Sequence, residues 1–158
     1  MQTVPAGRPC ILIVDDDEDA LELSRHLVRQ ANPGAKVVLA QGAPQAIAYL
    51  LKTSGPMGER ADMPELILLD VNMPGTDGFD VLQWVRRNRS LADIKVVMLT
   101  TSEADADIKR ASELGAHGYL IKYPSPAVVA CVLNQAHRTN SNAMAQPGSR
   151  PEMAEGKR

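Results

Sequence analysis

Short apolar runs alternate along the chain with longer stretches in which apolar residues recur every three or four positions. Runs of almost continuous Ile, Leu, Val, Met and Ala are typical of strands that are buried on both faces. The intervening stretches have the periodicity of amphipathic helices. We therefore predict strands at five runs: residues 10–14, 36–40, 66–70, 94–100 and 118–122.

One helix is expected after each strand, and turn-forming residues mark where the helices begin and end. The first helix ends near residues 32–34, and Pro44 lies in the first turn of the second, where a proline is tolerated. Residues 102–105 (SEAD) predict a capping box for the fourth helix, which ends at Gly115, and the fifth covers about residues 125–137. The residues predicted to face inward on the first three helices are Ala20, Leu23 and Leu27, then Ala43, Ile47 and Leu50, then Phe79, Leu82 and Val85.

This alternation of strands and helices predicts an α/β fold built from parallel βαβ units. Right-handed crossovers between parallel strands favour an open, doubly wound five-stranded sheet with helices on both faces. We expect residues 1–8 to form an N-terminal extension and residues 9–138 to form the folded domain. Residues 139–158 are polar, contain Pro and Gly and lack apolar periodicity, so we predict a disordered tail there.

The composition excludes several classes of protein. The 158 residues suit one domain, and 44% of them are hydrophobic, which is enough for a sizeable core. A net charge of −2 gives no electrostatic reason to expect binding to nucleic acid or to an anionic membrane. No apolar run approaches the ~20 residues that span a bilayer, and no signal peptide is evident, so we expect a cytoplasmic protein. Cys10 and Cys131 are expected to remain reduced.

Polar side chains follow four of the five predicted strands. Asp15 and Asp16 follow the first, Asp70 ends the third, Thr100 ends the fourth and Lys122 ends the fifth. Because the carboxyl ends of parallel strands meet at one edge of a sheet, these side chains should lie together there. Clustered carboxylates repel one another, and a hard divalent cation such as Mg²⁺ relieves that repulsion. A carboxylate beside the metal can attack phosphorus and form an acyl phosphate.

Each of these residues also has an ordinary structural interpretation. Acidic residues such as those at 15–19 often begin a solvated helix, Asp77-Gly78 can be a simple turn, and Thr100 or Lys122 can merely end a strand. Each interpretation is reasonable for one residue alone. Their coincidence at a single edge of the sheet favours a functional site.

Four segments resemble the receiver domains of bacterial two-component response regulators: ILIVDDDEDA, LILLDVNMPGTDGFDVL, VVMLTTSEADADI and LGAHGYLIK. The resemblance covers about residues 9–138. It implies a flavodoxin-like strand order of 2-1-3-4-5, bound Mg²⁺ and a phosphoryl group received from the phosphohistidine of a sensor histidine kinase. It also implies a phosphoacceptor that assists its own phosphorylation and dephosphorylation and is not a true enzyme.

The resemblance also implies a role for each matching residue. Asp15 and Asp16 are the acidic pair, Asp70 is the phosphoacceptor, Asn72 completes the metal site with its backbone carbonyl, Thr100 and Tyr119 are the switch residues and Lys122 is the catalytic lysine. The metal ligands are therefore expected to be Asp15, Asp16, Asp70 and Asn72. The turn after Asp70 (MPGTDG) is expected to hold the Asn72 carbonyl toward the metal.

One loop and one short segment resemble a subgroup of this family, whereas the residue after Lys122 departs from the family's usual pattern. The long loop KTSGPMGERADMP and the TTS sequence resemble the small, stand-alone regulators that are paired with bacterial phytochromes. The family usually has proline directly after the lysine, whereas this chain has Lys122-Tyr123-Pro124. A cis Lys–Pro bond is therefore impossible, and a cis Tyr123–Pro124 bond remains open.

The sequence disfavours two other functions. A phosphohydrolase with an aspartate nucleophile would need a second Asp at position 72 as general acid, and Asn72 cannot serve as one. A flavin or nucleotide module would need a glycine-rich phosphate loop after the first strand, where this chain has acidic residues. In the favoured interpretation, output passes through a partner or a homodimer on the face formed by helix four, strand five and helix five. That face is expected to include Ile108, Ala111, Tyr123, Val128 and Val132.

Overall fold

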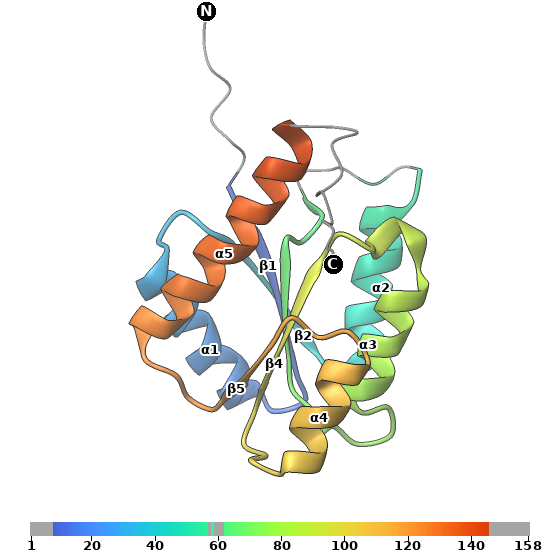
Figure 1. Cartoon of the computed structure of the whole chain (residues 1–158), viewed down its shortest axis with the longest axis vertical. Coiled ribbons are helices and arrows are strands. Elements are labelled where there is room, and N and C mark those ends of the chain that lie inside the picture. Colours follow the sequence, from blue (N-terminus) through green and yellow to red (C-terminus); the bar gives the residue numbers. More distant parts are fainter. Residues whose placement is uncertain (1–7, 57, 59–61, 146–158) are drawn as a thin grey trace, which may run out of the picture.

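In the computed structural model, which describes residues 8–56, 58 and 62–145, five parallel strands form one sheet (Figure 1). The strand order is β2-β1-β3-β4-β5, which confirms the predicted open, doubly wound arrangement. The register pairs Ile11 with Leu66 and Val97 with Gly118, so all strands point toward the same edge. The strands are β1 (Cys10–Asp15), β2 (Lys36–Gln41), β3 (Leu66–Leu69), β4 (Lys95–Thr100) and β5 (Gly118–Ile121).

Helices cover both faces of this sheet. Helices α1 and α5 lie on one face, and α2, α3 and α4 lie on the other (Figure 1). A short 3-10 helix, η2, follows α3. The bounds are α1 (Glu18–Ala31), α2 (Ala43–Ser54), α3 (Gly78–Arg87), η2 (Arg89–Leu91), α4 (Asp105–Glu113) and α5 (Pro126–Ala145).

The central strand β1 supplies both hydrophobic layers because successive side chains of a strand point to opposite faces. Leu12 and Val14 pack with the core beneath α2, α3 and α4, whereas Ile11 and Ile13 pack with the core beneath α1 and α5. Burial on both sides explains why these strands are continuous apolar runs in the sequence. It also leaves the ends of the strands as the place for polar chemistry.

The predicted inward faces were correct for α3 and partly wrong for α1 and α2. Leu23 is 43% exposed, and Leu21, Ser24 and Val28 are buried instead. In α2, Ala46 is fully buried and Ile47 is only half-buried. Small and polar residues occupy core positions here, so the pattern of large apolar residues alone gave an inaccurate helical phase.

The predicted capping box of α4 is wrong. The N-cap of α4 is Ala104, which provides no side-chain cap. The Ser102 hydroxyl instead donates to Asp107 Oδ2 at 2.6 Å and accepts from the Ala104 backbone N–H at 3.3 Å. After α4, Gly115 has a φ of +95°, as expected of a glycine that terminates a helix.

Helix α5 extends beyond its predicted end near His137 and reaches Ala145. Residues 139–145 therefore belong to a helix and not to the predicted tail, whose remaining part, 146–158, lies outside the described residues. His137 Nδ1 lies 3.0 Å from Glu65 Oε2, just before β3, so the helix is tied to the sheet near the predicted stopping point. Both cysteines are free thiols, as predicted. Among the described residues, no helix has the length and apolar character needed to cross a membrane.

Candidate functional site

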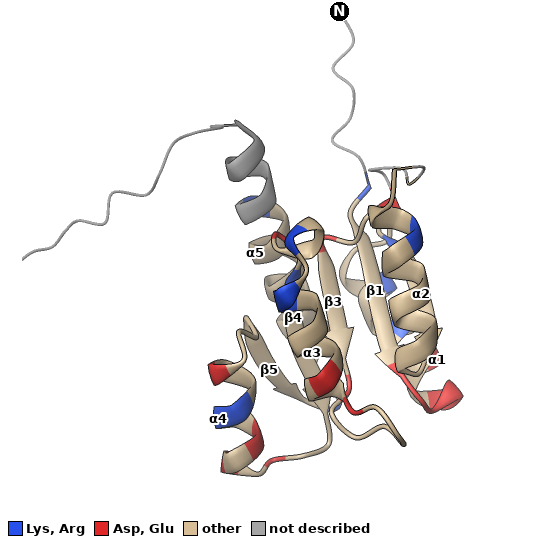
Figure 2. Ribbon diagram, turned by 90° about the vertical axis from the view of Figure 1, so that its right-hand side faces the viewer, with Lys and Arg blue, Asp and Glu red and all other residues tan. Residues whose placement is uncertain are grey.

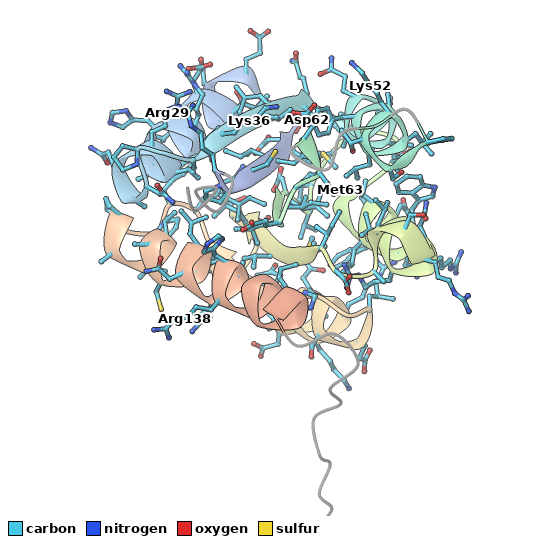
Figure 3. The ribbon with its side chains drawn as sticks, turned by 90° about the horizontal axis from the view of Figure 1, so that it is seen from above. Arg29, Lys36, Lys52, Asp62, Met63 and Arg138 are labelled. Atoms are coloured by element: carbon cyan, nitrogen blue, oxygen red, sulfur yellow. The ribbon has the colours of Figure 1, made fainter. Side chains whose placement is uncertain are left out.

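The carboxyl edge of the sheet brings the predicted site residues together. Asp15 ends β1, Asp70 directly follows β3, Thr100 ends β4 and Lys122 directly follows β5. Figure 2 shows acidic residues gathered at this end, while many Lys and Arg residues lie toward the other end. Figure 3 looks onto that opposite end and labels four cations from different elements: Arg29, Lys36, Lys52 and Arg138.

Three carboxylates form the centre of the site. One oxygen from each of Asp15, Asp16 and Asp70 can be chosen so that all three lie within 4.8 Å of one another. Asp15 and Asp70 are 3% and 6% exposed, while Asp16 is half-buried. An all-oxygen donor set of this kind fits Mg²⁺, which prefers one or two carboxylates and leaves room for water and phosphate oxygens. The residues present therefore fit the metal that the sequence predicted.

Lys122 balances part of this negative charge. Its ammonium pairs with Asp15 Oδ2 and lies 3.7 Å from Asp70 Oδ2. Burial alone lowers the pKa of Lys122, but the hydrogen bond to Asp15 and the charges of Asp70 and Asp15 outweigh burial and raise it above its ordinary value. Lys122 is therefore a fixed cation beside Asp70 at neutral pH.

The surroundings of Asp70 disfavour its charged form. Burial raises the pKa of Asp70 above its ordinary value of 3.8, and the charge of Asp15 raises it further. Lys122, a hydrogen bond from the Thr100 hydroxyl and one from the Asn72 backbone N–H act in the opposite direction without reversing the shift. Repulsion between Asp70 and Asp15 is the interaction that a divalent cation would relieve.

The acidic run after β1 divides into two parts with different roles. Asp17 is the N-cap of α1 and accepts from the backbone N–H groups of Asp19 and Ala20. Asp15 and Asp16 contribute instead to the carboxylate cluster. The ordinary interpretation of an acidic helix start therefore applies to Asp17 and not to the two residues before it.

The loop after Asp70 is fixed by close backbone contacts. Asp77 caps α3 in a capping box with Asp80, and the Gly78 N–H donates to the Val71 carbonyl at 2.9 Å. A Cβ atom on Gly78 would lie only 2.1 Å from the Asp70 carbonyl oxygen. Gly78, which the sequence predicts only as part of a turn, therefore allows α3 to begin against the backbone of Asp70.

A chain of hydrogen bonds connects the two predicted switch residues. Thr100 is fully buried, and its Oγ1 accepts from the Ser102 backbone N–H at 3.3 Å. The Tyr119 hydroxyl donates to the Ser102 carbonyl at 2.9 Å. Ser102, which the sequence predicted only as a helix cap, therefore lies between Thr100 and Tyr119.

The loop after β5 contains a cis peptide bond. It lies one position before the Tyr123–Pro124 bond, whose conformation the sequence left open. Among the described residues, the cis peptide bond is Lys122–Tyr123, so the Tyr123–Pro124 bond is trans. The Lys122 backbone N–H donates to the Thr100 carbonyl at 2.9 Å. The Lys122 ammonium also lies 5.9 Å from the centre of the Tyr123 ring.

An open parallel sheet with acidic residues, a threonine and a lysine at its carboxyl edge defines a class of signalling domain. Residues 11–132 match the family model described as the response regulator receiver domain. This chain therefore belongs to the receiver domain family of response regulators, as the resemblance in the sequence implied.

Curated relatives and solved structures agree with this assignment. The chain is 36% identical to the probable methanogenesis regulatory protein FilR2 of Methanothrix harundinacea, over 71% of this chain and 70% of that protein. It is 33% identical to the response regulator Rcp1 of Synechocystis, over 71% and 75%. The phosphorylated cyanobacterial phytochrome response regulator RcpA is 26% identical with a TM-score of 0.65, covering 92% of this chain and 99% of that one. The chemotaxis protein CheY4 of Vibrio cholerae is 26% identical with a TM-score of 0.68, covering 82% and 98%.

Proposed function

We propose that this receiver domain accepts a phosphoryl group on Asp70 from the phosphohistidine of a sensor histidine kinase. The observation that carries the proposal is the position of Asp70, a buried carboxylate in the acidic cluster and 3.7 Å from the Lys122 ammonium. An Asp70 carboxylate oxygen forms a bond to phosphorus while the phosphorus–nitrogen bond of phosphohistidine breaks. The bonding electrons return to the imidazole nitrogen, and an acyl phosphate remains on the protein.

The surrounding residues are suited to this transfer. Asp15, Asp16, Asp70 and the Asn72 carbonyl would hold Mg²⁺, which supplies charge neutralisation for the phosphoryl oxygens when bound. Lys122 contributes a second positive charge, 3.7 Å from Asp70 Oδ2. The Thr100 hydroxyl hydrogen-bonds the Asp70 carboxylate and could do the same for the transferred group. In this proposal the domain assists its own phosphorylation and dephosphorylation, although a receiver domain is not a true enzyme.

Phosphorylation would be transmitted through the Thr100, Ser102 and Tyr119 contacts. A new negative group at Asp70 would change the hydrogen bonding of Thr100. It would thereby shift the conformation of the loop between β4 and α4, whose Ser102 carbonyl accepts a hydrogen bond from the Tyr119 hydroxyl. A local charge change of this kind shifts the balance between two pre-existing conformations. The α4-β5-α5 face is the surface next to this loop.

We propose that this face binds a second copy of the chain. Ile108, Ile121, Tyr123 and Val128 are 39%, 37%, 44% and 41% exposed, respectively. Ala111, which the sequence analysis also placed on the face, is 1% exposed and belongs to the core. Val132 is half-buried against the core, and Ile121 is an additional exposed member. The similarity to RcpA supports a phytochrome-linked sensor kinase as the phosphoryl donor. We also propose, as the sequence predicts, that the reaction takes place in the cytoplasm.

The competing phosphohydrolase function is disfavoured by one residue. Asn72 occupies the position where that mechanism needs a carboxylic acid, and an amide cannot donate the required proton. The matches to response regulators favour the receiver function instead.

The experiment that tests the proposal compares Asp70→Asn with Asp93→Asn, an exposed aspartate just before β4. Each protein is incubated with Mg²⁺ and either acetyl phosphate or a purified phosphorylated histidine kinase. We expect the acid-stable label on Asp70→Asn to be weaker than on the wild type by a factor of about 100 or more, because the nucleophile is removed. Asp93→Asn should be labelled like the wild type. Equal labelling of Asp70→Asn, or a wild type that neither donor labels, would contradict the proposal.

A further inference from the structure

The end of the outer strand β2 contacts the backbone of the acidic loop. Gln41, the last residue of β2, pairs in register with Asp15 at the end of β1. Its side-chain Nε2 donates a hydrogen bond to the Asp16 carbonyl at 3.2 Å. The next residue, Gly42, donates its N–H to the Asp15 carbonyl at 3.1 Å. The turn after β2 therefore holds two successive carbonyl groups of the loop that carries the metal-binding carboxylates.

The contact from Gln41 completes the fixation of one peptide group. The carbonyl between Asp16 and Asp17 accepts from Gln41, and the N–H of the same peptide donates to Asp15 Oδ1 at 3.0 Å. With both polar groups bonded, this peptide plane has little freedom to rotate. Because the backbone on both sides of Asp16 sets the direction of its Cα–Cβ bond, these bonds determine where the Asp16 side chain begins.

Asp16 depends on this backbone support more than the other two carboxylates. Asp15 uses one oxygen for the Asp17 N–H and the other for Lys122. Asp70 is held by Thr100 and Lys122. Within the described part of the chain, the Asp16 carboxylate has no hydrogen bond or ion pair of its own. Its orientation toward a bound cation is therefore set by its rotamer preference and by the backbone alone.

Gln41 is itself held in place. Its backbone N–H donates to Gln45 Oε1 at 2.8 Å, and Gln45 lies in the first turn of α2. Gly42 follows with a φ of +97°, a conformation that favours glycine and turns the chain directly into α2. The Gln41 side chain thus projects from a fixed turn and not from a free strand end.

We propose that Gln41 is a positioning residue for the Mg²⁺ site and acts through the backbone of Asp16. This inference rests on the proposed function, because it assumes that the Asp15, Asp16 and Asp70 cluster binds Mg²⁺. Gln41 does not contact the metal. It reduces the conformational freedom that Asp16 would otherwise lose when the metal binds, and partners of metal-binding residues commonly act in this way.

The test uses the full chain with Gln41→Asn, which keeps the amide but shortens the side chain by one methylene group. The matched control is Gln30→Asn, an exposed position near the end of α1, far along the helix from the acidic loop. Mg²⁺ affinity is measured by isothermal titration calorimetry. We expect Gln41→Asn to weaken binding about tenfold, the low end for partners of metal-binding residues because this bond is exposed. Gln30→Asn should bind like the wild type.

Two further measurements separate positioning from general damage. The urea midpoint in EDTA should be the same for Gln41→Asn and Gln30→Asn, and labelling of Gln41→Asn by acetyl phosphate should recover at saturating Mg²⁺. Wild-type Mg²⁺ affinity in Gln41→Asn would overturn the inference while leaving the proposed function intact. A labelling defect that persists at saturating Mg²⁺ would also overturn it. A wild type without Mg²⁺ binding would overturn the proposed function together with the inference.

Discussion

The neighbours of Asp70 disfavour its charged form in the metal-free protein. Because burial and Asp15 raise the pKa of Asp70, the folded protein binds this proton more tightly than the unfolded chain does. The contribution of Asp70 to the free energy of unfolding therefore decreases as pH rises above 3.8, the unfolded value, and through the raised folded value. We predict that Asp70→Asn is more stable than the wild type in EDTA at neutral pH.

The difference between these two proteins should depend on pH and on metal. It should shrink toward zero below about pH 4, where the wild-type carboxyl is protonated in both states, and urea unfolding measured from about pH 4 to about pH 8 would reveal the trend. Saturating Mg²⁺ should stabilise the wild type more than Asp70→Asn, because the variant lacks one carboxylate ligand. An Asp70→Asn variant that is less stable than the wild type in EDTA at neutral pH would show that Asp70 is a structural anchor instead.

The loop between β3 and α3 depends on a glycine for a steric reason. A Cβ atom on Gly78 would lie 2.1 Å from the Asp70 carbonyl oxygen and 2.9 Å from the Val71 Cα, and backbone atoms cannot move aside as a flexible side chain can. We predict that Gly78→Ala lowers the free energy of unfolding by about 1–3 kcal/mol, the usual cost of overpacking. It should also slow the labelling of Asp70, because the strand end or the helix start must shift.

Gly34→Ala is the matched control for this variant. A Cβ atom on Gly34 would meet only the Asn32 side-chain oxygen at 3.5 Å, which is an ordinary contact. This control should change stability by less than about 0.5 kcal/mol, as is usual for surface substitutions, and should leave labelling unchanged. Urea unfolding and acetyl phosphate labelling of both variants test the prediction. Equal stability of the two would mean that the loop relaxes around the added methyl group.

Strand positions and the membership of the site were predictable because they depend on local sequence and on one topological rule. The apolar runs located all five strands, and the rule that parallel strand ends share an edge brought Asp15, Asp70 and Lys122 together. The phase of α1 was less predictable, because Ser24 is buried although it is polar. The contact between Gln41 and the Asp16 carbonyl was not predictable, because it depends on the strand register and on the turn at Gly42.

Helix ends were also difficult to predict from composition. Residues 139–145 are polar enough to suggest a tail, yet they continue a helix that is anchored earlier by Val129, Leu133 and Ala136 in the core. Extending an existing helix requires no new nucleation, so residues with modest helix propensity can continue it. Ser102 was predicted as a cap because its sequence pattern fits one, but the Asp107 side chain occupies its hydroxyl.

Charged residues and exposed apolar residues are distributed unevenly over the described part of the molecule. Acidic residues gather at the carboxyl edge of the sheet (Figure 2). Four of the six large apolar side chains that are exposed among the described residues, Ile108, Ile121, Tyr123 and Val128, belong to α4, β5, α5 or the loop between β5 and α5. Repulsion between acidic ends would oppose an association through the carboxyl edge. An association through the α4-β5-α5 face would leave the proposed phosphorylation site of each copy accessible to a kinase.

We predict that Tyr123→Asp weakens self-association through this face by about tenfold or more. Tyr123 is the exposed aromatic residue of the face, and aromatic anchors commonly dominate binding energy, so a charge placed there would be desolvated without a partner. The control is Leu51→Asp, which introduces the same charge at an apolar residue that is 54% exposed on α2, on the other side of the sheet from α5. Sedimentation velocity at several concentrations, with Mg²⁺ and with or without beryllofluoride, measures the association of each protein.

The expected pattern is stronger association of the wild type and of Leu51→Asp with beryllofluoride, and weak association of Tyr123→Asp under both conditions. Tyr123→Asp should still be labelled by acetyl phosphate, because the Lys122 ammonium keeps its ion pair with Asp15. Two results would contradict the prediction: a wild type that remains monomeric with beryllofluoride, or an equal loss of association in both variants. The first would mean that the exposed residues of the α4-β5-α5 face bind a different protein, and the second that the dimer forms without a specific anchor at Tyr123.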